Sequence, residues 1–140
     1  MKKTVICIVS TAAVFVLATA LNIQNMIWGG TPSVLGLVFS LVFCACLFVL
    51  PVVAKNRAFA VVSACFAAFS AIASTAGLLA VKGIISDTLA FVVVPPLTAF
   101  CGLSYIMSDY SVFYSVLIAF TLIAALNLIL TARKTAAAKA

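Results

Sequence analysis

The charged residues of this chain are confined to a few positions and leave four long stretches without any charge. These stretches run over residues 4–54, 58–81, 88–108 and 110–132 of the 140-residue sequence. Charged residues make up 7% of the chain, whereas a soluble domain needs about a quarter of its residues charged to cover its surface. We therefore expect the chain to be surrounded by a lipid bilayer.

The lengths of the uncharged stretches predict five hydrophobic segments. A membrane-spanning helix needs about 20 apolar residues, so the first stretch has room for two helices and each of the others for one. Gly29-Gly30 is expected to end the first helix, and Thr31-Pro32 to begin the second with Thr31 as its N-cap. The runs show no alternation of polar and apolar residues, which argues against strands. The prediction is an all-α, polytopic integral membrane helix bundle that forms one transmembrane domain over residues 1–140, with segments at 4–27, 33–54, 58–81, 88–107 and 111–132.

The first segment also resembles a secretory signal. Lys2 and Lys3 precede an apolar run, and Ala18-Thr19-Ala20 matches the small-residue pattern of a cleavage site. The apolar run continues past this point to Ile27-Trp28. We therefore expect the segment to be kept as a membrane helix, with its N-terminus on the cytoplasmic side of the plasma membrane.

The basic residues conflict with five crossings. Lys and Arg are concentrated on the cytoplasmic side of membrane proteins. Five crossings would place four basic residues on each side, whereas four crossings place seven on one side and leave only Lys82 on the other. The charges therefore predict an even number of crossings, although the apolar segments number five.

The fourth segment is the one expected to depart from a regular spanning helix, because Pro95 and Pro96 lie near its middle. Each proline removes a backbone N–H and clashes with the preceding helical turn. The segment either turns back at Pro95-Pro96 as a re-entrant hairpin, which gives four crossings, or spans as a kinked helix, which gives five. The sequence leaves both topologies open.

Small residues recur at every fourth position in two of the segments. In lipid, helices associate through close packing of small side chains, because lipid tails are as apolar as the helices themselves. The predicted packing residues are Gly36, Ser40 and Cys44 in the second segment and Ser63, Ala67 and Ala71 in the third.

Few polar side chains are available for a functional site. Asp87 and Asp109 are the only acidic residues, and their positions before apolar segments suit helix N-caps. Asp87 is also a candidate for binding a cation or proton at a pore mouth. Asn22 and Asn25 lie beside the Gly29-Gly30 break. Their side-chain amides are expected either to hydrogen-bond to a neighbouring helix or to bind a substrate. The predicted substrate or pathway residues are Pro95, Pro96, Asn22, Asn25 and Asp87.

The residue types argue against catalysis and against metal binding. The chain has no His and only two acidic residues, whereas general acid–base catalysis draws on His, Glu, Asp or Lys held in a site. The five cysteines lie in apolar segments, where Cys behaves as a small apolar residue. The basic residues that give the net charge of +6 flank the membrane segments. Membrane topology therefore explains their positions, and no nucleic-acid partner is needed to account for them. We expect no enzyme activity, no cofactor, no bound metal and no nucleic-acid partner.

Two functions fit these features. The first is transport-related, as a small oligomeric permease or channel or as the membrane subunit of a transport complex, because discontinuous helices often line substrate sites. The second is a non-catalytic structural or accessory subunit that packs through small-residue helix faces in a larger membrane complex. The expected protein partner is accordingly a second copy of the chain or a larger membrane protein. The sequence favours the transport-related function.

Overall fold

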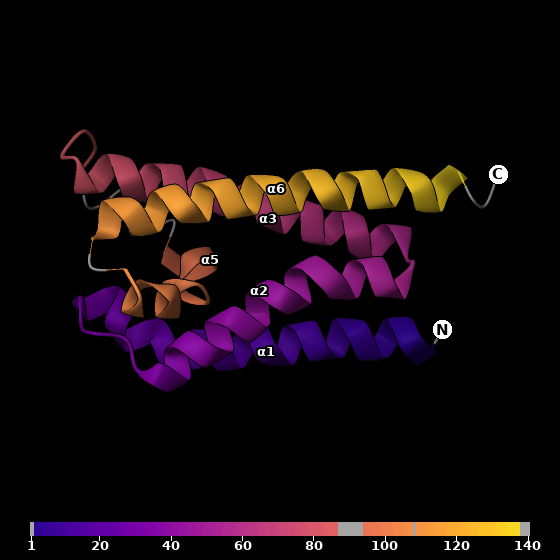
Figure 1. Cartoon of the computed structure of the whole chain (residues 1–140), viewed down its shortest axis with the longest axis horizontal. Helices are drawn as coiled ribbons and strands as arrows, with labels where there is room; N and C mark the ends of the chain where they lie inside the picture. The colour runs from indigo at the N-terminus through magenta and orange to yellow at the C-terminus, as the bar shows by residue number, and fades with distance from the viewer. Residues whose placement is uncertain (1, 87–93, 108, 138–140) are drawn as a thin grey trace.

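The computed structural model describes residues 2–86, 94–107 and 109–137, and the secondary structure in these ranges is entirely helical. Four helices are long and apolar enough to cross a membrane. They are α1 (Lys2–Trp28), α2 (Val34–Ala54), α3 (Arg57–Val81) and α6 (Tyr110–Ala137), shown in Figure 1. The all-α prediction is therefore confirmed for the described ranges, and four of the five predicted segments coincide with these helices.

The remaining predicted segment, 88–107, does not form one long helix over its described part. Residues 94–107 contain the five-residue helix α5 (Val94–Thr98) and the 3-10 helix η2 (Cys101–Tyr105). Pro95 and Pro96 lie in the first turn of α5, where a missing N–H removes no helical hydrogen bond. The chain turns at residues 99–100, after the prolines. The predicted kinked spanning helix is therefore not confirmed, and neither is the predicted turn at Pro95-Pro96.

In the connection between α1 and α2, the observed N-cap of α2 lies two residues after the predicted one. Gly29 has a φ of +69°, a left-handed conformation that suits glycine, and it directly follows the end of α1. Ser33 is the N-cap of α2 in place of Thr31, because the Ser33 hydroxyl accepts a hydrogen bond from the Gly36 N–H at 3.0 Å. Pro32 therefore precedes the helix instead of opening it.

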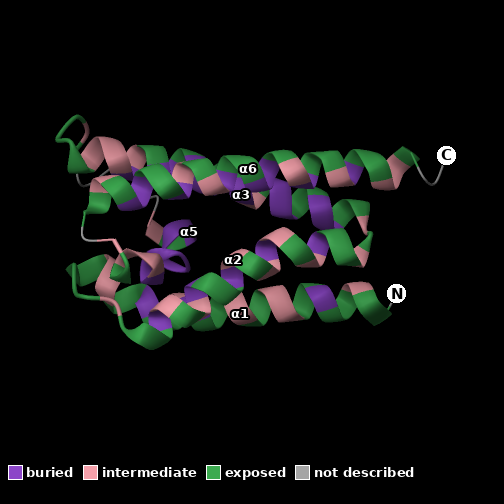
Figure 2. Ribbon diagram, in the orientation of Figure 1, coloured by how far each residue is buried: buried purple, intermediate pink, exposed green. Residues whose placement is uncertain are grey.

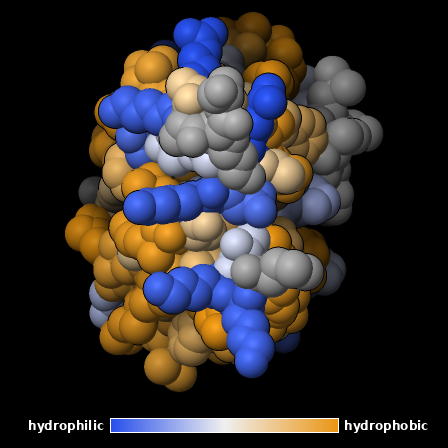
Figure 3. Space-filling model, turned by 90° about the vertical axis from the view of Figure 1, so that its right-hand side faces the viewer, coloured by the Kyte–Doolittle hydropathy of each residue, from blue (hydrophilic) through white to orange (hydrophobic). Residues whose placement is uncertain are grey.

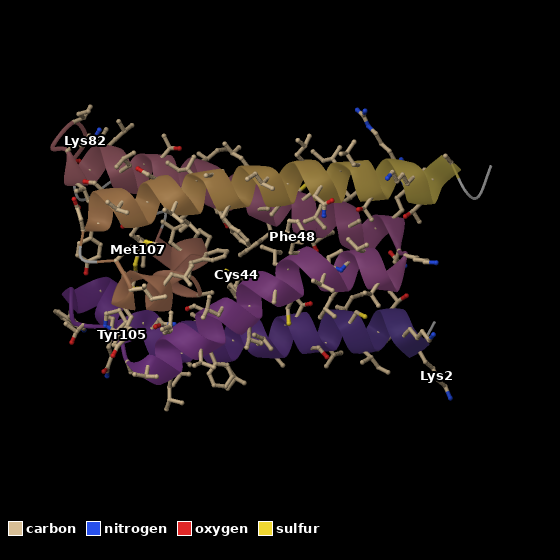
Figure 4. All side chains as sticks on the ribbon, viewed as in Figure 1. Lys2, Cys44, Phe48, Lys82, Tyr105 and Met107 are labelled. Atoms are coloured by element: carbon tan, nitrogen blue, oxygen red, sulfur yellow. The ribbon has the colours of Figure 1, made fainter. Side chains whose placement is uncertain are left out.

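The long helices form two pairs. α1 packs mainly against α2, and α3 packs along α6 in the most extensive contact of the bundle (Figure 1). Gly77 permits the close approach of α3 to α6, because a Cβ there would lie 2.6 Å from the ring of Tyr114. Figure 4 shows Lys2 and Lys82 at opposite ends of the bundle, and Figure 1 shows both chain termini at the Lys2 end.

The short helices α5 and η2 lie between the two pairs, at the end of the bundle away from the termini (Figure 1). η2 packs mainly against α2, while α5 contacts both α1 and α3. Residues 96–102 are all buried, whereas the outer sides of the long helices are largely exposed (Figure 2). The short helices therefore fill the core at this end and contact both pairs.

This arrangement predicts that both termini lie on the same side of the membrane. We expect a reporter that is active only in the cytoplasm to give the same signal when fused to the N-terminus and when fused after Ala140. Inserted after Gly83, at the opposite end of α3, the same reporter should give the reverse signal. A Cβ at Gly83 would meet no atom within 4 Å, so an insertion there disturbs little packing. Different signals from the two termini would contradict the arrangement.

Candidate functional site

Asn22 forms the centre of a polar cluster buried between α1, α2 and the short helices. Its side chain is fully buried, and its Nδ2 donates to the carbonyl oxygen of Ala18 at 2.8 Å within α1. The same nitrogen reaches α2, where it lies 3.2 Å from the hydroxyl of Ser40 and 3.4 Å from the carbonyl oxygen of Gly36. Asn22 therefore links α1 to α2 by hydrogen bonds in an apolar interior, where such bonds help hold helices together.

Ser40 extends this cluster to the turn between α5 and η2. The hydroxyl of Ser40 is fully buried and donates to the carbonyl oxygen of Ala99 at 2.7 Å. Residues 99–100 lie between two short helices, where backbone groups lack the regular partners of a long helix. The Ser40 hydroxyl thus supplies a partner for one of these buried carbonyl groups.

Two glycines allow α2 and η2 to touch through their backbones. A Cβ on Gly102 would overlap the backbone carbonyl of Gly36 and the hydroxyl of Ser40. A Cβ on Gly36 would in turn overlap the side chain of Asn22. We call Asn22, Gly36, Ser40, Ala99 and Gly102 the polar junction, and its close packing requires glycine at both positions.

Four phenylalanine rings meet next to the polar junction, one from each of α1, α2 and α3 and one from the turn before η2. The ring of Phe43 lies 5.4 Å from that of Phe15 and 5.2 Å from that of Phe100, measured between centroids. The ring of Phe66 lies 5.6 Å from Phe15 and 6.0 Å from Phe43, edge-on to both. These spacings are typical of favourable aromatic contacts. We call the four residues the aromatic floor.

A cleft of about 650 Å³ begins at the aromatic floor and extends between α1, α2 and α3 toward the end with the termini. Phe15, Phe43 and Phe66 line its inner part, and Ile8, Asn56 and Ala58 line the part nearest the termini. Ile8 is 43% exposed and Val62 is 66% exposed at its rim, so the cleft opens to the surroundings of the bundle. Each residue found to line this α1–α3 cleft is uncharged.

The predicted pathway residues are only partly brought together. Asn22 lies in the polar junction, whereas Asn25 lies near the end of α1, where its backbone oxygen accepts from the N–H of Gly29 at 3.0 Å. In α5, Pro95 is exposed and Pro96 is buried. Asp87 lies outside the described residues, so its role stays a prediction.

The predicted packing residues occupy buried positions with one exception. Gly36 and Ser40 are buried in the polar junction, and Cys44 is half-buried on the same helix. Figure 4 shows Cys44 and Phe48 on the side of α2 that faces α3 and α6. The remaining three, Ser63, Ala67 and Ala71, are buried in α3.

Asp109 lies directly before α6, as a helix cap should. Its Oδ1 accepts a hydrogen bond from the N–H of Ser111 at 2.7 Å, and its carbonyl oxygen accepts from the N–H of Phe113 at 3.0 Å. A carboxylate at this position meets unpaired N–H groups and the positive end of the helix dipole. The expected capping role of Asp109 is therefore confirmed.

The arrangement of the cysteines bears on the predictions about metal binding and disulfides. The five cysteines are all free, and they are spread over α1, α2, α3 and η2. Residues 2–86, 94–107 and 109–137 contain no group of three His, Cys, Asp or Glu side chains able to hold a metal ion. The site is instead built from backbone carbonyls, an amide, a hydroxyl and aromatic rings.

Sequence reasoning missed two residues that shape this site. Gly102 is the only glycine in the fourth predicted segment, and a lone glycine in an apolar segment indicates close packing. Its partner Gly36 is far away in the sequence, so the contact could not be predicted. Phe100 is one phenylalanine among 11, and nothing near it in the sequence marks it as the ring that contacts both Phe43 and Phe66. Both contacts depend on how distant segments pack.

Comparison with protein-family models, with curated proteins and with solved structures finds no match for this chain. Its function is therefore inferred from the polar junction, the aromatic floor and the α1–α3 cleft.

Removal of the Ser40 hydroxyl should loosen the short helices. In Ser40→Ala, the buried carbonyl of Ala99 loses its partner, which costs about 1–2 kcal/mol and corresponds to a roughly 5- to 30-fold increase in local opening. Cys101 is 2% exposed, so the rate at which it reacts with a maleimide reports this opening. The measurement uses detergent-solubilised protein in which Cys101 is the only cysteine.

Ser74→Ala is the matched control for this experiment. The hydroxyl of Ser74 is also fully buried, but it donates to the carbonyl oxygen of Ser70 within the same helix at 2.8 Å. We expect Cys101 to react at the wild-type rate in this variant. Equal labelling rates in Ser40→Ala and Ser74→Ala would contradict the anchoring role of Ser40.

Proposed function

We propose that this chain is a small integral membrane protein with a transport-related function, in which the α1–α3 cleft takes up an uncharged amphiphilic molecule. The proposed topology has four crossings, by α1, α2, α3 and α6, and a re-entrant segment that includes α5 and η2. The proposed location is the plasma membrane, with both termini in the cytoplasm. The observation that carries the proposal is the uncharged cleft that ends on rings from three long helices next to the turn between α5 and η2.

The distribution of basic side chains supports this topology. Six of the described basic residues lie near helix ends, on the side of the bundle that carries the chain termini. Figure 3 shows hydrophilic side chains gathered on this face. Only Lys82 among the described basic residues lies at the opposite end. The bias agrees with the rule that Lys and Arg face the cytoplasm. The six residues are Lys2, Lys3, Lys55, Arg57, Arg133 and Lys134.

The polar junction supports the proposal that α5 and η2 form a re-entrant segment. Irregular backbone is tolerated at membrane depth only where protein or water covers it. Here Ser40 bonds to Ala99, and Gly102 packs directly on Gly36, so the turn is covered by protein. Discontinuous helices frequently form the substrate sites of secondary transporters.

The chemistry of the cleft selects the class of molecule. Its walls are mostly apolar, with polar side chains only at Thr11, Asn56 and Ser63. A charged group placed there would lose its hydration without gaining a partner of opposite charge, which is strongly unfavourable. An aromatic or aliphatic body can pack on the aromatic floor, while an uncharged polar group remains near the open end of the cleft.

Filling the cleft should stop transport. We expect liposomes that contain the purified chain to admit a neutral coumarin glucoside faster than protein-free liposomes, with entry reported by β-glucosidase enclosed in the lumen. Ala12 lines the cleft, and Ala12→Trp should reduce the protein-dependent rate at least about fivefold because the indole occupies the binding volume.

Ala13→Trp provides the matched control for the cleft variant. Ala13 is exposed on the same helix but does not line the cleft, so this variant should keep the wild-type rate. An unchanged rate in Ala12→Trp would contradict the role of the cleft. A wild-type rate equal to that of protein-free liposomes would contradict autonomous transport.

The exposure of α1 favours a second candidate function, that of an accessory subunit. α1 has its main contact with α2, and many of its large side chains are exposed, including Val5 at 56%, Ile6 at 63% and Val16 at 61%. Such a helix has a long apolar side available to lipid, to another copy of the chain or to a larger membrane protein.

Purification from the native membrane distinguishes the two functions. For a transport protein that acts without other chains, we expect extraction in mild detergent to yield this chain alone, as a monomer or homo-oligomer. The measurement is the molar composition of the purified material by quantitative mass spectrometry. A larger membrane protein present in fixed stoichiometry would instead establish the accessory role.

A further inference from the structure

A second concave surface lies between α3 and α6, away from the α1–α3 cleft. It has a volume of about 430 Å³ and is located at the end of the bundle that carries the termini. Its walls consist largely of small side chains, among them Ala64, Cys65 and Ala68 from α3 and Ala132 and Ala136 from α6. We call this surface the α3–α6 groove.

The groove exists because the two helices carry different side chains at their two ends. Toward the Lys82 end, the ring of Tyr114 lies directly against Gly77 and fills the space between the helices. Around Ala68 and Ala132, by contrast, the lining side chains are too small to fill the same interface. The result is an apolar groove between two helices that pack closely elsewhere.

Two arginines line the groove at its end nearer the chain termini. Arg57 is the first residue of α3, Arg133 lies near the end of α6, and both side chains are exposed. The sequence has only two acidic side chains, and Asp109 lies before α6 at the opposite end of the bundle. Two guanidinium groups beside one apolar groove are complementary to a molecule that has an anionic group and a hydrocarbon chain.

We infer that the α3–α6 groove is a binding site for one anionic phospholipid, with the phosphate held by Arg57 and Arg133 and one acyl chain lying in the groove. Guanidinium groups bind phosphate oxygens through paired hydrogen bonds, and basic pockets between membrane helices bind anionic headgroups. The exposed side chains of Val61, 42% accessible, and Ile129, 44% accessible, flank the groove and let the acyl chain join the surrounding lipid.

The geometry also indicates where the selectivity arises. In a bilayer, moving an acyl chain from lipid into the groove changes little, because both surroundings are apolar. We therefore assign the discrimination between an anionic and a zwitterionic lipid to Arg57 and Arg133, the charged residues that line the groove. Lys2 and Lys3 contribute to the general positive potential of the same end, but they do not line the groove.

Cys65 provides a direct probe of occupancy, because it is exposed and lines the groove. The experiment uses the full chain with Cys65 as its only cysteine, solubilised in mild detergent and mixed with phosphatidylglycerol or with phosphatidylcholine. We expect phosphatidylglycerol to slow the reaction of Cys65 with a maleimide at about tenfold lower lipid concentration than phosphatidylcholine. Inorganic phosphate at the same concentrations should not protect Cys65.

Paired substitutions test whether the two arginines form a local site. Arg57→Gln together with Arg133→Gln should reduce the preference for phosphatidylglycerol to less than about twofold. Lys2→Gln together with Lys3→Gln removes the same charge from the same end of the bundle and should leave the preference unchanged. Ala68→Leu fills the groove with both arginines intact and should weaken the protection by both lipids.

Three results would overturn the inference. The first is equal protection of Cys65 by the two lipids in the otherwise unsubstituted chain, a comparison that requires no arginine variant to fold. The second is an equal loss of preference in the lysine and arginine pairs, which would show a diffuse surface charge. The third is protection by inorganic phosphate alone, which would show an anion site without a lipid.

Discussion

The hydrogen bond from Ser40 to the carbonyl oxygen of Ala99 is the buried polar contact that joins the short helices to α2. Residues 96–102 are buried although they form no long helix, so their backbone groups need partners from the rest of the protein. Ser40 supplies one such partner at 2.7 Å, and Asn22 connects Ser40 to α1. One buried polar cluster therefore joins α1, α2 and the turn before η2, in surroundings where an unpaired carbonyl would be costly.

The position of α5 and η2 accounts for the shape of the remaining bundle. At their end, the short helices fill the core between the α1–α2 pair and the α3–α6 pair. Toward the termini, the described residues include no short helix between the two pairs, and the α1–α3 cleft lies next to the rings of Phe15, Phe43 and Phe66. The α3–α6 groove is also found in this half of the molecule. The α1–α3 cleft and the α3–α6 groove therefore both lie away from α5 and η2, in the half of the bundle that carries the termini.

The sequence predicted the long helices well because their signal is local. A run of about 20 apolar residues between charges is sufficient to identify a helix that can cross a membrane. The cap of α2 was misplaced by two residues, since Thr31 and Ser33 offer similar hydroxyl groups and only the backbone geometry selects Ser33. The fourth segment was harder, because Pro95 and Pro96 are compatible with both a kink and the start of a short helix. Gly36 and Ser40 were recognised as packing residues without their contacts to Gly102 and Ala99.

The sequence by itself predicted that lipid surrounds this protein, and it determined the helical class and the clustering of the basic residues at the ends of apolar segments. These properties follow from composition and spacing along the chain, since lipid excludes charges and requires internally bonded backbone. Only the tertiary structure decided that Asn22, Ser40 and Ala99 meet, that Phe100 joins the aromatic floor, and that Arg57 and Arg133 share one groove. Such contacts join residues that are far apart in the chain, and they depend on side-chain volume and helix orientation, which the spacing of residues along the chain does not specify.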